Sequence, residues 1–252
     1  MMKKIIAFDL DGTLAESKSA LPDMMSELIS QLLQDYQVCV ISGGKFGQFE
    51  KQLLGNLHID PLQLEKLHLM PTCGTRYHTY DLTDQAWHMN YAEDFSDEEK
   101  TQIIAALEEG IDELNLREAT PWGDLIEDRG SQITFSALGQ EAPVHAKEAW
   151  DQDSKKKHAL RDVVAEKIPA YEVRTGGSTS IDITKLGIDK AYGMRKLMEL
   201  TGASADEILF VGDRLEEGGN DYPVKAMGID SIAVAKWQDT ALVIETLNKT
   251  AA

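Results

Sequence analysis

The sequence contains very little cysteine: only Cys39 and Cys73 occur among 252 residues, and they form no CxxC pair. Small secreted scaffolds depend on a dense set of disulfides, so this class of protein is excluded. Two isolated thiols are typical of a reducing compartment, and we therefore expect a cytoplasmic location. A chain of this length can bury a hydrophobic core of its own, as one large domain or two modest ones.

Long apolar runs are also missing. No segment approaches the roughly 20 apolar residues that a membrane-spanning helix requires. The chain reaches a carboxylate at Asp9, which is too early for a secretory signal peptide, and we expect no membrane partner. Ligand-spaced histidine pairs are absent as well, because the recurring histidines lie ten residues apart without a nearby acidic cluster, at His58, His68, His78 and His88. The sequence therefore predicts no zinc site.

Positive charge is scarce. The 25 Lys and Arg residues are outnumbered by 43 Asp and Glu residues, which gives a formal net charge of −18. A chain of this charge repels nucleic acid at long range, so nucleic acid is not expected as a partner. A small anionic metabolite would need a bound cation or a local basic pocket in order to bind. The remaining composition, 42% hydrophobic and 27% charged, is typical of a folded globular protein.

Four short runs rich in β-branched residues have the pattern of buried parallel strands. They are residues 4–8, 37–41, 207–211 and 231–234. Helix-period apolar stripes at 22–34 and 189–201 each precede one of these strands. A strand, a helix and a strand in succession predict a right-handed crossover. We therefore expect βαβ units from both ends of the chain to build one parallel sheet.

The middle of the chain has a different pattern. It predicts helices at 97–114 and 155–167, and strands at 132–136, 171–174 and 180–183. This mixture indicates an α+β domain inserted into the domain that carries the parallel sheet. We expect a discontinuous core of residues 1–87 and 187–252, with the inserted domain at residues 88–186.

Two carboxylates stand where the first predicted strand ends. The segment Phe8-Asp9-Leu10-Asp11-Gly12-Thr13-Leu14 places Asp9 and Asp11 two residues apart, on one side of an extended chain. Ligands bind at the carboxyl ends of parallel strands, which is where these side chains would lie. A calcium loop is excluded, because its glutamate belongs at the twelfth position, which is Ala20 here. A simple Asx-type turn is the alternative.

Further polar motifs follow other predicted strands. Ser42-Gly43-Gly44 follows the strand at 37–41 and offers a hydroxyl and backbone amides to a phosphoryl group. Gly212-Asp213 ends the strand at 207–211, and Asp221 follows eight residues later. Acids from two strand ends predict a magnesium site. Lys190 begins the helix at 189–201, although a surface lysine beside an acid is the alternative there.

Taken in order, these residues resemble the four motifs of the haloacid dehalogenase (HAD) superfamily of phosphoryl-transfer enzymes: Asp9-Leu10-Asp11-Gly12-Thr13, Ser42, Lys190, and Gly212-Asp213 with Asp221. The inserted domain stands where subclass IIB of this superfamily carries its type C2 cap. Three segments are similar to segments of eukaryotic-type phosphomannomutases: Glu127-Asp128-Arg129-Gly130, Gly176-Gly177-Ser178-Thr179-Ser180-Ile181-Asp182, and Glu217-Gly218-Gly219-Asn220-Asp221. The resemblance covers nearly the whole chain and implies a Rossmann-like α/β core with an inserted α+β cap.

The resemblance implies a role for each matching residue of the core. Asp9 would attack phosphorus and form an aspartyl phosphate, and Asp11 would act first as acid and then as base. Magnesium would be held by Asp9, the backbone carbonyl of Asp11 and Asp213, with Asp221 in or beside its coordination shell. Ser42 and Lys190 would hold phosphoryl oxygens, and the loop glycines Gly43 and Gly44 would contribute to substrate binding.

The cap arginines of this family are only partly retained. Arg129 matches one of them, and Ser180 and Asp182 match polar contacts to the substrate. Three other arginine positions of the family are occupied here by Lys18, Gln140 and Lys147. Lysine keeps the charge without the bidentate fork, and glutamine loses both, so affinity for the phosphate that is not reacting should fall. Without the resemblance, a surface salt bridge with a neighbouring acid would be the alternative for Arg129.

We therefore expect a phosphatase that hydrolyses a small sugar phosphate, because hydrolysis needs only one bound phosphate. The alternative is a phosphomannomutase that interconverts hexose 1-phosphate and 6-phosphate, since Lys18, Arg129 and Lys147 could still form a cationic pocket. A second alternative is a catalytically silent sugar-phosphate sensor, against which the retained Asp9 and Asp11 count. The cap-mediated dimers of the family make a homodimer the expected assembly.

Overall fold

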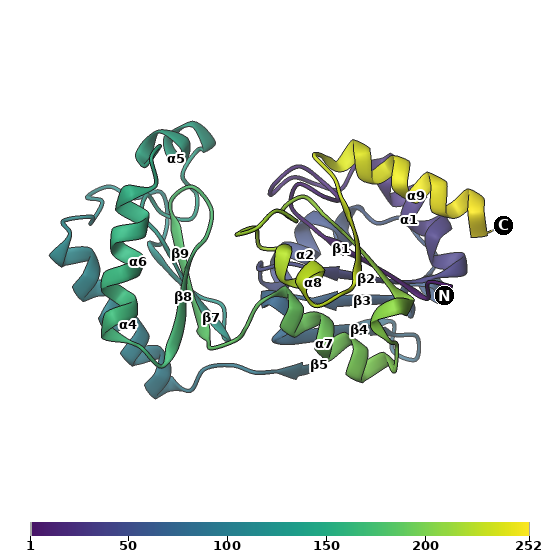
Figure 1. Cartoon of the computed structure of the whole chain (residues 1–252), viewed down its shortest axis with the longest axis horizontal. Helices are drawn as coiled ribbons and strands as arrows, with labels where there is room; N and C mark the ends of the chain where they lie inside the picture. Colours follow the sequence, from purple (N-terminus) through teal and green to yellow (C-terminus); the bar gives the residue numbers. More distant parts are fainter. Residues whose placement is uncertain (1, 252) are drawn as a thin grey trace. The chain divides into compact units, whose positions relative to one another are not determined.

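The computed structural model describes residues 2–251, which form two compact units (Figure 1). The core unit contains residues 2–92 and 189–251 of the described chain, and the cap unit contains residues 93–188. The border that the sequence predicts at residue 87 falls inside β5 (Ala86–Ala92), which pairs with β4 (Arg76–Asp81) along its length. The cap is inserted between two segments of the core, as its pattern of elements indicated.

A seven-stranded sheet organises the core, in the order β11-β10-β1-β2-β3-β4-β5. The four predicted strands are confirmed as β1 (Ile5–Asp9), β2 (Gln37–Ile41), β10 (Ile208–Gly212) and β11 (Asp230–Ala233). They pair in parallel, and β3 (Leu67–Met70) joins them in the same direction. The antiparallel strands β4 and β5 extend the sheet beyond β3. This edge was not predicted, because β5 is largely exposed and carries no apolar run.

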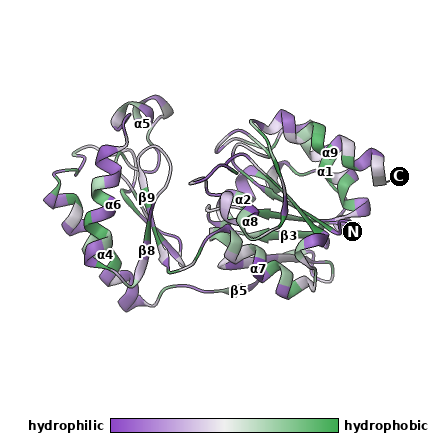
Figure 2. Cartoon of the chain, viewed as in Figure 1, coloured by the Kyte–Doolittle hydropathy of each residue, from purple (hydrophilic) through white to green (hydrophobic). Residues whose placement is uncertain are grey.

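Helices cover both faces of the core sheet (Figure 1). On one face, α1 (Asp23–Asp35) and α9 (Trp237–Ala251) contribute to an apolar cluster with Phe8 of β1. On the other face, α7 (Lys190–Thr201) and α8 (Tyr222–Ala226) contribute to a second cluster with Ala7. Because β1 is buried on both sides, its sequence is a continuous apolar run. Figure 2 shows hydrophobic strands at the centre of the core and helices of mixed hydropathy around them.

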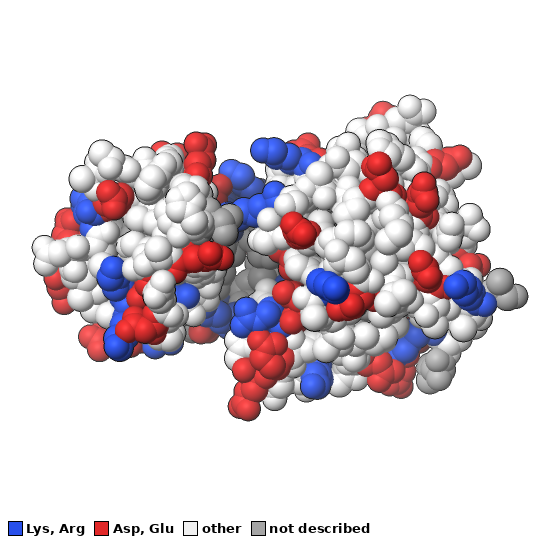
Figure 3. All heavy atoms as spheres, turned by 90° about the horizontal axis from the view of Figure 1, so that it is seen from above, with Lys and Arg blue, Asp and Glu red and all other residues white. Residues whose placement is uncertain are grey.

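The remaining helices of the core are short. They are α2 (Phe46–Gln52), α3 (Pro61–Leu64) and the 3-10 turns η1 (Leu54–Asn56), η2 (Thr72–Gly74) and η3 (Ala205–Glu207). Within residues 2–251, no helix combines the length and the apolar character needed to cross a membrane. On the face shown in Figure 3, Asp and Glu side chains are spread over the surface and mixed with Lys and Arg.

The cap contains a four-stranded antiparallel sheet in the order β6-β7-β9-β8. Its strands are β6 (Ile126–Asp128), β7 (Gln132–Ser136), β8 (Tyr171–Thr175) and β9 (Ser180–Lys185). The helices α4 (Asp97–Glu113) and α6 (Lys155–Lys167) pack on one face through an apolar cluster that includes Phe135 and Ile183. The predicted helices and strands of the cap are thereby confirmed, while β6 and α5 (Val144–Trp150) were not predicted.

The opposite face of the cap sheet is polar. Strand register places Glu127 opposite Thr134, Thr134 opposite Asp182, and Asp182 opposite Arg174. Residues directly opposed in antiparallel strands share a face of the sheet, so these four side chains form one row across it. We refer to Glu127, Thr134, Asp182 and Arg174 as the polar row.

Candidate active site

Three carboxylates meet where β1 and β10 end. Asp9 is the last residue of β1, Asp213 follows β10, and Asp221 immediately precedes α8. One carboxylate oxygen from each lies within 4.8 Å of those from the other two. The two strands are parallel neighbours, with Phe8 beside Val211, so their carboxyl ends are adjacent. The structure thus brings together three acids that the sequence places far apart, and we call them the carboxylate cluster.

Lys190 lies within this cluster. Lys190 is only 1% exposed. Its Nζ contacts the carboxylate of Asp9 and donates to Asp221 Oδ1 at 2.5 Å. Helix α7 positions it, because Asp189 caps the helix by accepting from the Tyr192 amide at 2.8 Å. A buried ammonium is stable only when it is paired, and the alternative of a surface lysine is therefore excluded.

Burial shifts the pKa values of the carboxylate cluster and of Lys190. Removal from water raises the pKa of Asp9 to about 7, Lys190 acts against this rise, and Asp221 and Asp213 add to it. Desolvation lowers the pKa of Lys190, but the charges of Asp9 and Asp221 outweigh it and raise the pKa overall, so the ammonium stays protonated. Burial and Asp221 also raise the pKa of Asp213. One ammonium does not balance three carboxylates.

The cluster suits a hard divalent cation. Its donors are all carboxylate oxygens, which are the ligands that magnesium prefers, and its excess negative charge favours a further cation. A cation at this point would also lower the pKa of Asp9 and keep it ionised. A second group, Asp81, Asp84 and His88, lies on the β4–β5 hairpin, but its three residues are exposed and nothing else points to a ligand there.

The residues after Asp9 shape the approach to the cluster. Gly12 has a φ of +85°, and a Cβ atom there would lie 2.5 Å from Asp213 Oδ2, so only glycine fits. Thr13 is buried, and its hydroxyl donates to Asp9 Oδ2 at 3.3 Å. Thr13 belongs to the motif that the sequence singled out, but its contact with Asp9 was not predicted.

The loop after β2 lies beside Asp9, since Asp9 pairs with Ile41 in the sheet. Ser42 is 4% exposed, and its Oγ accepts from the Gly44 amide at 3.1 Å. The amides of Thr72 and Cys73 donate to the carbonyls of Gly44 and Ser42, at 2.9 Å each. Thr72 and Cys73 have φ values of 49° and 56°, a left-handed conformation that non-glycine residues rarely adopt. This strained segment is therefore tied by two backbone hydrogen bonds to the loop of Ser42, Gly43 and Gly44.

The carboxylate of Asp11 bonds to residues outside the carboxylate cluster. It accepts from the Lys18 amide at 2.7 Å and from two side-chain amides, Gln48 Nε2 at 2.7 Å and Gln52 Nε2 at 3.1 Å. The predicted metal contact of this residue is through its backbone carbonyl and stays a prediction. Gln48 and Gln52 were missed from the sequence, where their one-turn spacing after Ser42-Gly43-Gly44 was the available signal.

The substrate-binding residues predicted in the cap each contact a different neighbour. Arg129 Nε donates to Glu127 Oε2 at 2.7 Å, with side chains that are 16% and 19% exposed. Lys147 Nζ donates to the backbone carbonyl of Gln140 at 3.0 Å. Lys18 lies in the core unit, and its side chain is exposed.

Ser180 and Asp182 both lie on β9 and point to the polar side of the cap sheet. Asp182 Oδ1 accepts from Thr134 Oγ1 at 2.7 Å and from Gln132 Nε2 at 2.9 Å. Arg174, opposite Asp182 in the polar row, was not singled out from the sequence. Its Nη1 donates to the backbone carbonyl of Ile188 at 2.6 Å.

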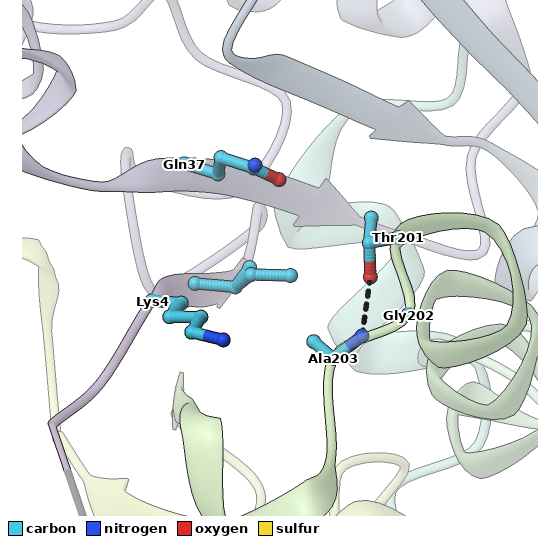
Figure 4. Close-up of a pocket in the computed structure, with 6 residues that line it drawn as sticks. Lys4, Gln37, Thr201, Gly202 and Ala203 are labelled. Carbon is cyan, nitrogen blue, oxygen red and sulfur yellow. Dashed lines mark hydrogen bonds between the residues drawn. The ribbon is translucent and has the colours of Figure 1, made fainter.

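A small pocket of about 50 Å³ lies at the other end of the core strands (Figure 4). It is lined by Lys4, Ile5, Gln37, Thr201, Gly202 and Ala203, and the Ala203 amide donates to Thr201 Oγ1 at 3.3 Å. Because Ile5 and Gln37 are the first residues of β1 and β2, this pocket is separated from Asp9 by the length of the strands. We assign it no part in the chemistry.

Solved structures of HAD-type proteins share this fold. A haloacid dehalogenase-like hydrolase from Bacteroides thetaiotaomicron aligns with a TM-score of 0.61 at 14% identity, over 97% of this chain and 99% of that one. A trehalose-6-phosphate phosphatase related protein aligns with a TM-score of 0.60 at 14% identity, over 98% of each chain. IMP-bound, N-terminally truncated IMP-nucleotidase from Plasmodium falciparum aligns with a TM-score of 0.69 at 15% identity, over 98% of this chain and 68% of that one. The fold and the relatives define an enzyme of the HAD type.

The family model for eukaryotic phosphomannomutase matches residues 25–249, and the chain belongs to this family. The phosphomannomutase of Encephalitozoon cuniculi (strain GB-M1) is 26% identical over 247 residues, covering 94% of this chain and 91% of its own. The phosphomannomutase of Schizosaccharomyces pombe (strain 972 / ATCC 24843) is 24% identical over 229 residues, covering 88% and 85%. The resemblance indicated by the sequence motifs is confirmed.

Proposed function

We propose that this protein is a magnesium-dependent phosphoryl-transfer enzyme that interconverts hexose 1-phosphate and hexose 6-phosphate. The proposal is carried by the carboxylate cluster around Lys190 in a chain of the phosphomannomutase family. The sequence alone favours hydrolysis, but the family match supports the mutase alternative better. The substrate class, the homodimer and the cytoplasmic location stay predictions.

Asp9 is the proposed nucleophile. One of its oxygens forms a bond to phosphorus while the bond from phosphorus to the sugar oxygen breaks, and Asp11 donates a proton to that oxygen. In the second half, Asp11 takes the proton of the attacking sugar hydroxyl, the phosphoryl group passes to that hydroxyl, and Asp9 returns to a carboxylate. Division into two steps lets one site serve both positions of the hexose.

Lys190 and Ser42 are proposed to stabilise the phosphoryl oxygens during both steps. The ammonium is already desolvated and fixed, so it needs no reorganisation when charge develops on the phosphoryl group. Asp9, Asp213 and Asp221 would hold magnesium, which supplies charge neutralisation to the phosphoryl oxygens when bound. The buried hydroxyl of Thr13 would orient the Asp9 carboxylate by its hydrogen bond.

The polar face of the cap sheet is the proposed surface for the sugar and its second phosphate. Asp182 is fixed by Thr134 and Gln132, which leaves a defined acceptor for sugar hydroxyls. Arg129 provides a guanidinium for phosphate. A mutase needs such a contact because the phosphate that is not reacting has to be held while the other is transferred.

Hydrolysis is the second candidate, and one observation favours it. The guanidinium of Arg129 already forms an ion pair with the carboxylate of Glu127. The phosphate that is not reacting therefore has to compete with this carboxylate for the guanidinium. Gln140 brings no charge to its position. Weak retention of the second phosphate would leave water to attack the aspartyl phosphate.

One experiment separates these functions. The enzyme is incubated with magnesium, mannose 1-phosphate and catalytic glucose 1,6-bisphosphate, and phosphorus NMR follows mannose 6-phosphate and inorganic phosphate. Isomer formation that outruns phosphate release supports the mutase. Phosphate release without isomer identifies the hydrolase. Magnesium-dependent ligand binding without either product would identify the silent sensor, and Asp9→Asn provides the inactive control for both reactions.

A further inference from the structure

Helix α2 directs two side-chain amides at Asp11. The helix begins two residues after the Ser42-Gly43-Gly44 loop, and Gln48 and Gln52 stand one turn apart on the same side of it. Gln48 Nε2 donates to Asp11 Oδ2 at 2.7 Å, and Gln52 Nε2 donates to Asp11 Oδ1 at 3.1 Å. The Lys18 amide adds a third donor, to Oδ1 at 2.7 Å. All three donors fix the same carboxylate.

The two glutamines also fix each other. Gln48 Nε2 donates to Gln52 Oε1 at 2.9 Å, so the oxygen of Gln52 is occupied and its amide nitrogen is turned to Asp11. Gln52 is only 4% exposed, and a buried amide is costly unless it keeps its hydrogen bonds. The amide of Gln48 lies so near the preceding loop that a Cβ atom on Gly44 would come within 2.1 Å of Gln48 Oε1. The phosphate-binding loop and this pair are therefore packed as one unit.

The hydrogen bonds divide the two oxygens of Asp11 unequally. Among the described residues, Oδ1 accepts from two donors and Oδ2 accepts from one. A carboxylate oxygen has two lone pairs, so Oδ1 is saturated and Oδ2 keeps one lone pair. We propose that Gln48 and Gln52 are positioning residues that hold Asp11 with Oδ2 free to exchange a proton with the substrate oxygen. This inference rests on the proposed function, in which Asp11 is the acid and base.

The test compares two phosphate esters in the first chemical step. Glucose 1,6-bisphosphate, which can phosphorylate Asp9 in the proposed mutase, has a poor leaving group that needs a proton from Asp11, whereas 2,4-dinitrophenyl phosphate has a leaving group that departs without one. Single turnovers with enzyme in excess and magnesium present isolate transfer to Asp9, and rapid quench follows the loss of phosphate from each ester. In Gln48→Leu, we expect the rate with glucose 1,6-bisphosphate to fall about 100-fold, as general acid catalysis is lost, and the rate with the aryl ester to change less than about threefold.

A matched control and a second variant complete the test. Gln34→Leu places the same substitution at an exposed position of α1 and should change neither rate. Gln48→Asn keeps the amide but shortens its reach. Like Gln48→Leu, it should lower the rate with the sugar phosphate and leave the rate with the aryl ester nearly unchanged. An unchanged aryl rate shows that each variant is folded.

Three outcomes would overturn the inference. An equal fall with both esters would indicate a merely structural role for Gln48. Equal rates in variant and wild type would show that Asp11 needs no such support. A wild-type enzyme that transfers phosphate from neither ester would instead overturn the proposed function itself, and the inference with it.

Discussion

Lys190 Nζ lies 2.5 Å from Asp221 Oδ1, and the two side chains are 1% and 0% exposed. The same ammonium contacts Asp9, so one buried cation at the start of α7 joins the end of β1 to the residue that precedes α8. Buried ion pairs contribute little net stability, but removal of one partner leaves charge that cannot be solvated. We therefore expect this contact to serve the electrostatics of the site more than the stability of the fold.

Replacement of Lys190 by methionine should destabilise the protein and abolish catalysis. The change leaves buried carboxylates without their ammonium, at a cost of about 3–5 kcal/mol in the free energy of unfolding. Loss of a preorganised charge for the phosphoryl oxygens should lower kcat by at least about 100-fold. Urea denaturation and single-turnover kinetics measure the two effects. A variant as active as wild type would contradict the proposed role of Lys190.

Removal of magnesium should stop turnover and lower the melting temperature. The carboxylate cluster carries excess negative charge, which a divalent cation relieves in the folded state alone. Asp213→Asn should weaken magnesium binding by about tenfold or more and leave the fold intact, because Asp213 is only half-buried. Calorimetric titration measures the affinity, and Asp206→Asn on the turn before β10 is the control. Equal magnesium affinity in Asp213→Asn and wild type would contradict this assignment.

The contribution of the buried His68 to stability should fall as the pH drops from about 6.5 to about 4, whereas Asp9, with its raised pKa, acts in the opposite direction. Burial lowers the pKa of His68 to about 4, and its ring nitrogens bond to Tyr77 and Gln37. The unfolded chain binds the proton near the usual value of 6.5, so the unfolded state gains protons first as the pH falls. The shift corresponds to about 3 kcal/mol.

Urea denaturation at pH 7 and pH 5 measures this effect. His68→Gln should lose part of the dependence, whereas exposed His158→Gln should keep it. His78, whose pKa burial and Arg76 also lower to about 4, should account for part of the remainder. A free energy of unfolding that changes between the two pH values in His68→Gln as it does in wild type would contradict the assignment.

Release of Arg129 from Glu127 should strengthen binding of a second phosphate. Glu127→Gln keeps the shape of the side chain but removes the carboxylate that pairs with the guanidinium. A guanidinium that no longer pairs with the Glu127 carboxylate can form two hydrogen bonds with phosphate. We expect KM for glucose 1,6-bisphosphate to fall by about tenfold, which corresponds to about 1.4 kcal/mol.

Two control variants test whether the change in KM is specific to the pair of Glu127 and Arg129. Glu166→Gln removes an exposed acid from α6 of the same unit and should leave KM unchanged. The double change with Arg129→Met should cancel the gain. An unchanged KM in Glu127→Gln would show that Arg129 does not bind the second phosphate.

The carboxylate cluster could be predicted because two of its three residues stand at the ends of parallel strands. Asp9 and Asp213 follow apolar runs, and the carboxyl ends of neighbouring parallel strands meet at one edge of the sheet. Gln48 and Gln52 could not be predicted in the same way. Their contact with Asp11 depends on how a seven-residue helix packs against a loop, and no pattern of residue types identifies it.

The cap shows the same limit. Arg129 was found through its motif, but Arg174 faces Asp182 only because of the register between β8 and β9. Register depends on pairing between segments that a single sequence does not specify residue by residue. The β4–β5 hairpin was missed for a related reason, since its outer strand lies at a largely exposed edge and lacks the apolar run of a central strand.

The contact between Lys190 and Asp9 spans 181 positions of the chain. During synthesis, the central strand β1 emerges long before β10, its neighbour, and before the lysine and the two remaining acids of the cluster. The cap has to be made in the interval, so a growing chain can fold the cap while the carboxylate cluster has only Asp9 and no ammonium. Contacts of such separation slow folding, and the chain becomes competent for catalysis only when its last quarter joins its first strand.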